Sequence, residues 1–214
     1  MKSVLVVYSG GLDSYTLLNK AFKEFDRIEA ITFDYGQKHK KEIQYATQVC
    51  LELKIEHEVV NLDLENILSG SALVGEKKIP EGNYDKEQMK QTVVPNRNMI
   101  MISIAASLAI KNKLHTLWYA AHAGDHEIYP DCRPEFIESL AAVLQICDYH
   151  KINFQAPFMN YSKTDIVAEG LRMNLDFSKT WTCYVGDESP CLRCGSCLER
   201  KSAFELNNVQ DPLR

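Results

Sequence analysis

The segment Ser-Gly-Gly-Leu-Asp-Ser at residues 9–14 has the composition of an anion-binding turn. It follows the apolar run at residues 4–8 and precedes residues with helical periodicity, so it is predicted to join a strand to a helix N-terminus. Backbone N–H groups and the positive end of a helix dipole lie there, and paired glycines let the backbone approach a phosphate. An ordinary capped turn is the alternative, but the flanking serines and Asp13 favour phosphate. No Gly-Lys-Ser/Thr closes the segment, so it is not a Walker A loop.

Four cysteines near the C-terminal end have the spacing of metal ligands: Cys183, Cys191, Cys194 and Cys197. The last three repeat a two-residue spacing, and Gly195 eases the tight turn between them. Four thiolates at these separations suit tetrahedral Zn²⁺ in a closed, structural site. Such a site would stabilise a tail that has too little apolar material to fold alone. An iron–sulfur cluster is the competing assignment, and a redox Cys-x-x-Cys pair is a third.

Two basic residues are predicted at helix starts, where a cation is disfavoured unless it faces an anion. Arg97 lies in the segment Val-Pro-Asn-Arg-Asn at residues 94–98, directly before an alanine-rich helical stretch. Its guanidinium can bind a phosphate through two hydrogen bonds. Lys163 follows Ser162, which is a candidate N-cap. A surface location is the alternative for both, and it weighs more heavily for Lys163 because exposed lysines are common.

The segment at residues 124–134 holds the densest group of polar side chains in the middle of the chain. Asp125 and Asp131 can accept hydrogen bonds from the N–H edge of a heterocycle, and Tyr129 can stack on it. Cys132 is a candidate substrate contact and a less favoured covalent nucleophile, because no activating histidine stands at a fixed spacing. The structural alternative is a loop in which Asp131 caps the helix that follows.

Strands and helices alternate along the chain, which predicts an α/β layer architecture around a mainly parallel sheet. The predicted strands are residues 4–8, 27–36, 56–62 and 116–121, with a short extended piece at 154–158. The predicted helices follow the turn at 9–14 and occupy residues 40–53, 98–111, 134–147 and 162–173. Because ligands bind at the carboxyl ends of such strands, the first, second and fourth strands are expected to converge on one site.

The second predicted strand ends in Phe-Asp-Tyr-Gly-Gln at residues 33–37. The adenine ring of a nucleotide can lie against residues 31–33 while the phosphates of that nucleotide reach the glycine turn. A plain strand-to-loop junction is the alternative. Residues 63–92 are polar and contain glycines, and a connection of this length is either disordered or a mobile loop over a site.

The composition favours one domain with a small appendage in a chain of 214 residues, of which 45% are hydrophobic. The formal net charge of −5 includes no long basic block, which argues against a nucleic-acid partner. No apolar run approaches the roughly 20 residues that cross a bilayer, and the first residues lead into a strand and not into a signal peptide. We therefore expect a cytoplasmic protein without a membrane or nucleic-acid partner.

These motifs together resemble one family. The glycine turn is similar to the pyrophosphate-binding loop of the N-type ATP pyrophosphatases. Residues 33–39, 94–98 and 129–133, together with the four-cysteine tail, resemble the 7-cyano-7-deazaguanine synthase (QueC) family within that superfamily. The resemblance runs from residue 4 to about residue 200, and the combination is far more specific than the turn alone.

The resemblance implies an ATP-dependent ligase that acts on 7-carboxy-7-deazaguanine and ammonia. The acid would be adenylated with release of pyrophosphate, converted by ammonia to the amide, and adenylated again to give the nitrile. It also implies a Rossmann-like (adenine nucleotide alpha hydrolase-like) sheet with helices on both faces over residues 1–180, a zinc-binding tail at 181–214, Mg²⁺ with ATP, and a homodimer. A reaction that stops at the amide is an alternative, since the segment at 121–127 departs from the family pattern. A tRNA-modifying sulfurtransferase is another, and a zinc-ribbon interaction module is the non-enzymatic one.

Three sets of residues follow from this resemblance. The catalytic candidates are Asp13, which would organise Mg²⁺, and Arg97 and Lys163, which would neutralise phosphate charge. The ATP-binding candidates are Tyr8, Ser9, Gly10, Gly11, Leu12, Asp13, Ser14, Phe33, Arg97 and Lys163. The substrate-binding candidates are Gln37, Asp125, Tyr129, Asp131, Cys132 and Arg133.

Overall fold

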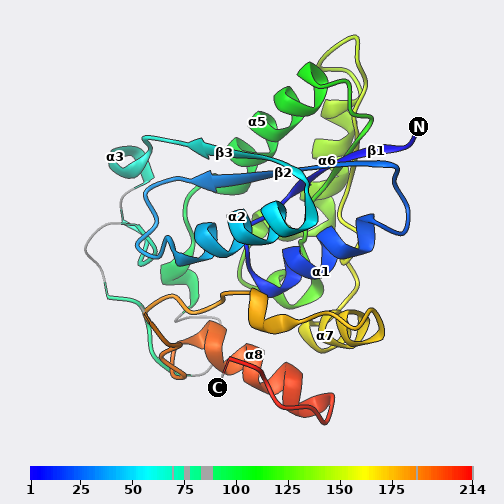
Figure 1. Ribbon diagram of the computed structural model, residues 1–214. Helices are drawn as coiled ribbons and strands as arrows, with labels where there is room; N and C mark the ends of the chain where they lie inside the picture. The colour runs from blue at the N-terminus through cyan, green and yellow to red at the C-terminus, as the bar shows by residue number, and fades with distance from the viewer. Residues whose placement is uncertain (69, 75–77, 83–88, 187, 214) are drawn as a thin grey trace.

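Five parallel strands form the centre of the computed structural model (Figure 1). The structure describes residues 1–68, 70–74, 78–82, 89–186 and 188–213. The strands are β1 (Ser3–Val7), β2 (Arg27–Asp34), β3 (Glu56–Asn61), β4 (Thr116–Trp118) and β5 (Asn153–Gln155). They lie in the order β3-β2-β1-β4-β5, and every neighbouring pair is parallel. The predicted α/β architecture is confirmed.

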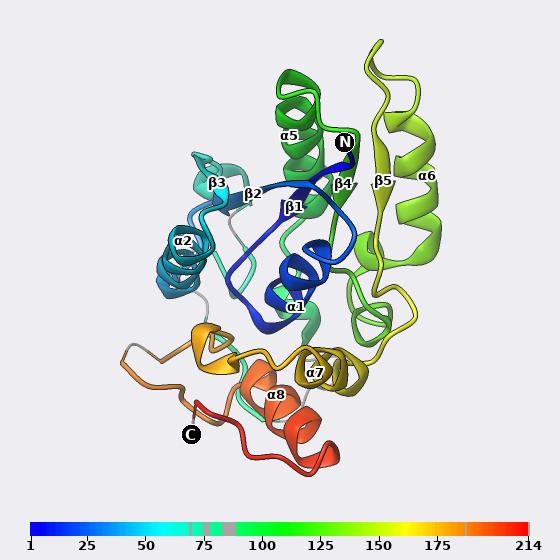
Figure 2. The same cartoon turned by 45° about the vertical axis from the view of Figure 1, so that its right-hand side comes forward.

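Helices cover both faces of this sheet (Figure 2). The helices are α1 (Leu12–Ala21), α2 (Lys41–Leu53), α3 (Glu65–Leu68), α5 (Arg97–Lys111), α6 (Pro134–Leu144), α7 (Lys163–Arg172) and α8 (Gly195–Leu206). Side chains alternate across a strand, so Val4 and Val6 pack with α1, α2 and α7 while Leu5 packs with α5 and α6. Both faces of β1 are therefore buried, which explains its continuous apolar sequence.

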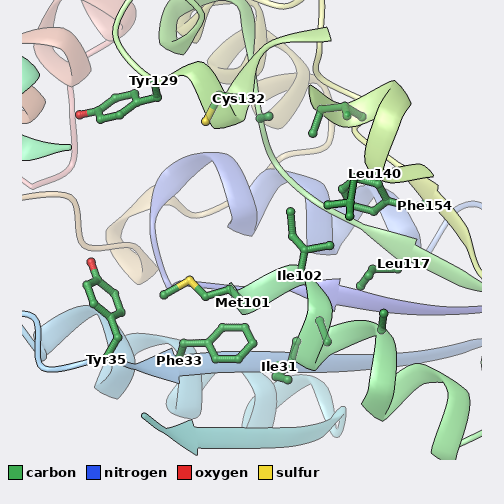
Figure 3. Packing of buried hydrophobic residues seen from close by; sticks show 14 of the residues in the cluster. Ile31, Phe33, Tyr35, Met101, Ile102, Leu117, Tyr129, Cys132, Leu140 and Phe154 are labelled. Atoms are coloured by element: carbon green, nitrogen blue, oxygen red, sulfur yellow. The ribbon is translucent and has the colours of Figure 1, made fainter. Parts of the chain in front are cut away.

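The order of the strands places a candidate binding site at the carboxyl ends of the central strands. From β1 the chain runs to β2 and β3 on one side of β1. After α5 it returns to form β4 on the other side of β1. In open parallel sheets, such a switch point leaves a crevice at the carboxyl ends of the two central strands. The glycine turn follows β1 and the polar residues at 119–125 follow β4, so both lie at this crevice. On the α5 face, Phe33, Met101 and Ile102 pack together beneath it (Figure 3).

Several element ends differ from the prediction. β4 ends at Trp118, three residues early, because its partner β5 spans only Asn153–Gln155 and one further bond joins Tyr119 N–H to the Gln155 carbonyl at 3.0 Å. α6 ends at Leu144, where the Gln145 side chain turns to donate to the carbonyl of Ile152 at 2.7 Å.

The helix caps are partly as predicted. Ser162 caps α7 in a reciprocal capping box with Asp165, which confirms its predicted role. Asp131 does not cap α6, whose N-cap is Arg133. The Asp131 carboxylate instead accepts a hydrogen bond from the backbone N–H of Asn98 at 3.3 Å. Asp131 therefore caps α5 from a neighbouring loop. A carboxylate there compensates for the absence of acidic residues in the first turn of α5.

The segment of residues 63–92 is described in part, and its Leu73 lines the crevice. The described parts include α3, the 3₁₀ turn η1 (Lys90–Thr92) and the buried residues Ser71–Val74. The prediction of a mobile loop lies partly outside the described residues, which omit 69, 75–77 and 83–88.

The C-terminal segment packs on the sheet domain through α8, which lies against α7 (Figure 1). Buried Arg200 of α8 donates two hydrogen bonds to the Asp211 carboxylate, at 2.9 and 3.0 Å, and one to Thr180 at 2.7 Å. This network joins α8 to the segments that precede and follow it. The predicted boundary between a sheet domain at residues 1–180 and a tail at residues 181–214 stays a prediction. Within the described ranges, every helix falls short of the length and apolarity needed to span a membrane.

Candidate active site

The glycine turn closes on the first turn of α2. Gly10 has φ +87°, and a Cβ at that position would overlap the backbone carbonyl of Glu42. Only glycine fits both constraints without strain. Ser9 Oγ lies 3.0 Å from Ser14 Oγ and accepts from the Gly11 N–H at 3.2 Å. Because α1 begins without a side-chain cap, its first N–H groups are left for a ligand.

Two adjoining cavities, of about 240 and 160 Å³, occupy the crevice beside this turn. Among the predicted ATP-binding residues, the larger cavity is lined by Tyr8, Ser9, Asp13, Ser14, Phe33 and Arg97. The smaller is lined by Ser9, Gly11, Leu12, Asp13, Arg97 and Lys163. Gly10 lines neither cavity, because it packs under α2. The structure thus brings the predicted ATP set to one place, and the individual roles stay predictions.

A cluster of charged side chains stands at the wall of the second cavity. Lys163 Nζ lies 2.6 Å from Asp13 Oδ2 and 3.4 Å from Glu199 Oε2. Burial by itself would raise the pKa of Asp13, but Lys163 and His122 outweigh it and hold this pKa below its ordinary value. Burial raises the pKa of Glu199 despite the nearby Lys163. The cluster therefore holds Asp13 ionised in a partly dry site.

Asp13 has a second oxygen, Oδ1, that is buried without a hydrogen-bond partner among the described residues. A buried, unpaired carboxylate oxygen is costly unless a ligand satisfies it. Carboxylate oxygens are the protein ligands that Mg²⁺ prefers in nucleotide-binding sites. A second carboxylate, that of Asp125, lines the same cavities. The donor set thus fits a divalent cation that accompanies a nucleotide.

His122 is buried between two carboxylates. Its Nδ1 accepts from the Gly124 N–H at 3.1 Å, which assigns the ring proton to Nε2. Nε2 lies 3.4 Å from Asp125 Oδ2 and 3.8 Å from Asp13 Oδ2. The ring therefore presents an N–H to both acids and orients them.

Arg97 projects from the start of α5 toward both cavities. Its Nη1 donates to the Tyr35 hydroxyl at 3.2 Å, and the guanidinium stacks 5.5 Å from the centre of that ring. The Nε donates to Asn98 Oδ1 at 3.2 Å. Held in this way, the guanidinium faces the crevice, which the prediction required for phosphate binding.

The predicted substrate-binding residues separate into two groups. Asp125, Tyr129 and Cys132 line the second cavity. Arg133 is exposed and donates to the His126 carbonyl at 2.7 Å, and Gln37 braces its own turn by accepting from the Tyr35 N–H at 2.8 Å. Neither these two nor Asp131 lines the two main cavities. Their roles in substrate binding stay predictions.

Cys132 is placed as a neutral thiol. Asn98 Nδ2 lies 3.5 Å from its Sγ and the Tyr119 hydroxyl 3.8 Å from it. Burial, together with the charges of Asp125 and Asp131, raises the pKa of this thiol. A thiolate nucleophile needs the opposite environment, so a packing or contact role fits better.

Several cavity-lining residues were absent from the predicted site sets, among them Glu42, Tyr119, His122, Tyr184 and Glu199. Tyr119 and His122 follow β4, so the rule for strand ends would have included them. Glu42 and Glu199 carried no sequence signal, because charged residues in helices are usually solvated.

The four predicted cysteine ligands come together. The sulfur atoms of Cys183, Cys191, Cys194 and Cys197 all lie within 4.8 Å of one another. Hydrogen bonds from the Cys194 and Cys197 thiols and from backbone N–H groups hold the pKa of Cys183 well below its ordinary value. Four thiols in one compact group are compatible with structural zinc, and an iron–sulfur cluster takes the same ligand set.

The fold is that of an α/β protein with an open parallel sheet and a glycine turn at its switch point, and solved structures share it. U34-tRNA thiolase NcsA from Methanococcus maripaludis superposes with a TM-score of 0.52 at 17% identity, over 97% of this chain and 65% of that one. NMN synthetase from Francisella tularensis gives 0.51 at 12% identity, over 98% and 78%. At these identities the likeness concerns the fold alone.

The sequence identifies the family. Residues 3–208 match the model of queuosine biosynthesis protein QueC. The chain is 49% identical to 7-cyano-7-deazaguanine synthase 1 of Colwellia psychrerythraea and 47% identical to 7-cyano-7-deazaguanine synthase of Pseudoalteromonas translucida. Each match covers 99% of this chain and 98% of the relative. The chain therefore belongs to the QueC family, which confirms the resemblance.

Proposed function

We propose that this protein is the ATP-dependent ligase that makes 7-cyano-7-deazaguanine from 7-carboxy-7-deazaguanine and ammonia for queuosine-type biosynthesis. Family membership over nearly the whole chain supports the product. The observation that carries the mechanism is the Asp13–Lys163 pair, set at the glycine turn between two cavities. One cavity suits the nucleotide and the other suits the heterocyclic acid.

The first step is adenylation of the acid. A carboxylate oxygen attacks the α-phosphorus of ATP, and the bond to the β-phosphate oxygen breaks with its electron pair, releasing pyrophosphate. The N–H groups at the start of α1 and the hydroxyls of Ser9 and Ser14 bind the departing pyrophosphate. Arg97 and Lys163 neutralise the charge that develops on the phosphates, which is the main source of rate in such transfers.

The later steps reuse the same arrangement. Ammonia attacks the acyl carbon of the adenylate and AMP leaves, which gives the amide. The amide oxygen then attacks the α-phosphorus of a second ATP, and loss of AMP with the nitrogen protons gives the nitrile. Asp125, Tyr129 and Cys132 line the cavity in which we place the deazapurine. An acyl group held there lies beside the glycine turn for both adenylations.

Two metals accompany this proposal. Asp13 and Asp125 would hold Mg²⁺, which supplies charge neutralisation when it is bound with the nucleotide. Cys183, Cys191, Cys194 and Cys197 would hold Zn²⁺, which supplies a structural cross-link and takes no part in the reaction. The small-molecule substrates follow from the family, and the homodimer and the cytoplasmic location stay part of the proposal.

The test is a direct assay. The protein is incubated with 7-carboxy-7-deazaguanine, ammonium, ATP and Mg²⁺, and the products are followed by mass spectrometry. We expect two AMP and two pyrophosphate for each nitrile, the ratio that two adenylations require. An accumulating amide with one AMP would show that the reaction stops there. Release of ADP, or release of AMP without the acid, would refute the ligase.

A further inference from the structure

A third, much smaller cavity of about 30 Å³ lies beside the two large ones. Its lining includes Tyr35, Gln37, Lys38, His39 and Ile79. Lys38 is exposed and His39 is partly exposed, so this lining extends toward the protein surface. This volume exceeds the roughly 10–15 Å³ that a cavity needs to hold one water molecule. Ammonia and ammonium fit such a space, whereas the nucleotide and the deazapurine do not.

Glu42 separates this cavity from the crevice. Together with Leu73 and Tyr184, it lines all three cavities. It lies in the first turn of α2, and its backbone carbonyl packs against Gly10, so the helix start and the glycine turn are in direct contact. Glu42, Leu73 and Tyr184 therefore stand where the third cavity adjoins the other two, and Tyr35 lines the third cavity and the larger one.

The surroundings of Glu42 suit proton exchange near neutral pH. Burial raises the pKa of its carboxyl to about 7, while the charge of Arg97 and a hydrogen bond from Gln37 oppose the rise. The phenols of Tyr35 and Tyr184 also face it, and Lys38 and His39 line the same small cavity. A group that is half ionised near the working pH is an efficient general base.

We propose that the small cavity admits the nitrogen substrate as ammonium, and that the Glu42 carboxylate takes its proton to release ammonia beside the acyl adenylate. This assignment rests on the proposed function. Neither the motifs of the sequence nor the predicted catalytic set includes Glu42. The carboxylate faces a cavity of the right size, on the path toward the glycine turn.

Ammonium gives one proton to Glu42, and the freed lone pair of nitrogen forms the bond to the acyl carbon. The bond from that carbon to the adenylate oxygen breaks, and AMP leaves with the electron pair. The nitrogen loses its extra proton to the departing phosphate, and Glu42 returns its proton to solvent through the small cavity.

The experiment separates adenylation from amide formation. Glu42→Gln is compared with wild type in two assays: acid-dependent exchange of labelled pyrophosphate into ATP without ammonium, and amide formation with ammonium varied from pH 7 to 9. We expect exchange to be retained. Amide formation at pH 7 should fall about 10²-fold in kcat/KM for ammonium, the usual size of general-base catalysis. The deficit should shrink as pH rises, because free ammonia then replaces the lost base.

Two further variants keep the result interpretable. Glu52→Gln removes an acid from the same helix that pairs with Lys179 on the surface, and it should behave as wild type in both assays. Ile79→Phe fills part of the small cavity, and it should raise KM for ammonium while KM for ATP stays unchanged.

Each outcome decides the question. A pH-independent deficit in Glu42→Gln, or a loss of exchange together with amide formation, would overturn the proposal and leave Glu42 a structural role. Equal ammonium dependence in wild type and Glu42→Gln would overturn it as well. If wild type shows no exchange that depends on the acid, the proposed function itself fails, and this result is distinct from the others.

Discussion

Lys163→Met tests the charged centre of the site. Lys163 Nζ lies 2.6 Å from Asp13 and 3.4 Å from Glu199, and the lysine side chain is only 11% exposed. Methionine keeps most of the apolar stem and removes the positive charge. Two carboxylates then face each other across a partly buried site without their shared partner.

The expected magnitudes follow from this geometry. Removing one partner of a buried ion pair costs about 3–5 kcal/mol, and we expect about 3 kcal/mol because the Asp13 side chain retains 23% exposure. For a chain of this size that lowers Tm by roughly 6–12 °C. Losing a positive charge at the developing pyrophosphate should slow adenylation about 10²- to 10³-fold.

The assays are acid-dependent pyrophosphate exchange and thermal unfolding. Lys163→Arg should recover part of the stability, because it restores the charge. The control is Lys201→Met on α8, where an exposed lysine lies 3.8 Å from Glu205 and both properties should stay close to wild type. An exchange rate in Lys163→Met that equals the wild-type rate would refute the catalytic part of this reasoning. An unchanged Tm would refute the electrostatic part.

Three further predictions concern the turn, the tail and pH. Gly10→Ala should destabilise the fold by at least about 2 kcal/mol in denaturant unfolding, because a positive φ and overlap with the Glu42 carbonyl oppose any Cβ. Cys194→Ser should lower bound zinc from about one per chain to near zero in elemental analysis, together with Tm; iron in the wild type would reverse the metal assignment. Glu42 has a folded pKa raised to about 7, so its contribution to stability is complete below its unfolded pKa and is lost as pH rises through 7. Glu42→Gln should therefore be the more stable protein at pH 8 by about 2–3 kcal/mol, with the difference closing near pH 5; an equal difference at both pH values would contradict this.

Local sequence signals predicted the parts of the site that depend on backbone chemistry. The glycine pair between an apolar run and a helix predicted the turn, and the position of Ser162 predicted the N-cap of α7. The cysteine spacing predicted that the four cysteine sulfur atoms come together. These features depend on residues close together in the chain, where steric and hydrogen-bonding preferences act directly.

Two placements that the sequence did not indicate have one cause in common. The structural alternative for Asp131 was a cap on the next helix, but its carboxylate caps α5 across the fold, at Asn98. Arg133 belonged to the predicted substrate set and lies exposed outside the cavities. In both cases a residue's neighbours in space come from distant segments, which local periodicity does not specify.

The sequence alone determined the chemistry that the chain can carry: a glycine turn before a helix, four closely spaced thiols, strand ends with polar residues and, through the combination of motifs, the family. The tertiary structure decided which side chains meet. Parallel strand order brings Asp13 from α1, His122 from the chain after β4 and Glu199 from α8 around Lys163. It also places the half-buried Glu42 beside a cavity with room for one small molecule. Burial and charge proximity shift the pKa values of Asp13, Glu199 and Glu42, and both depend on packing between segments far apart in the chain.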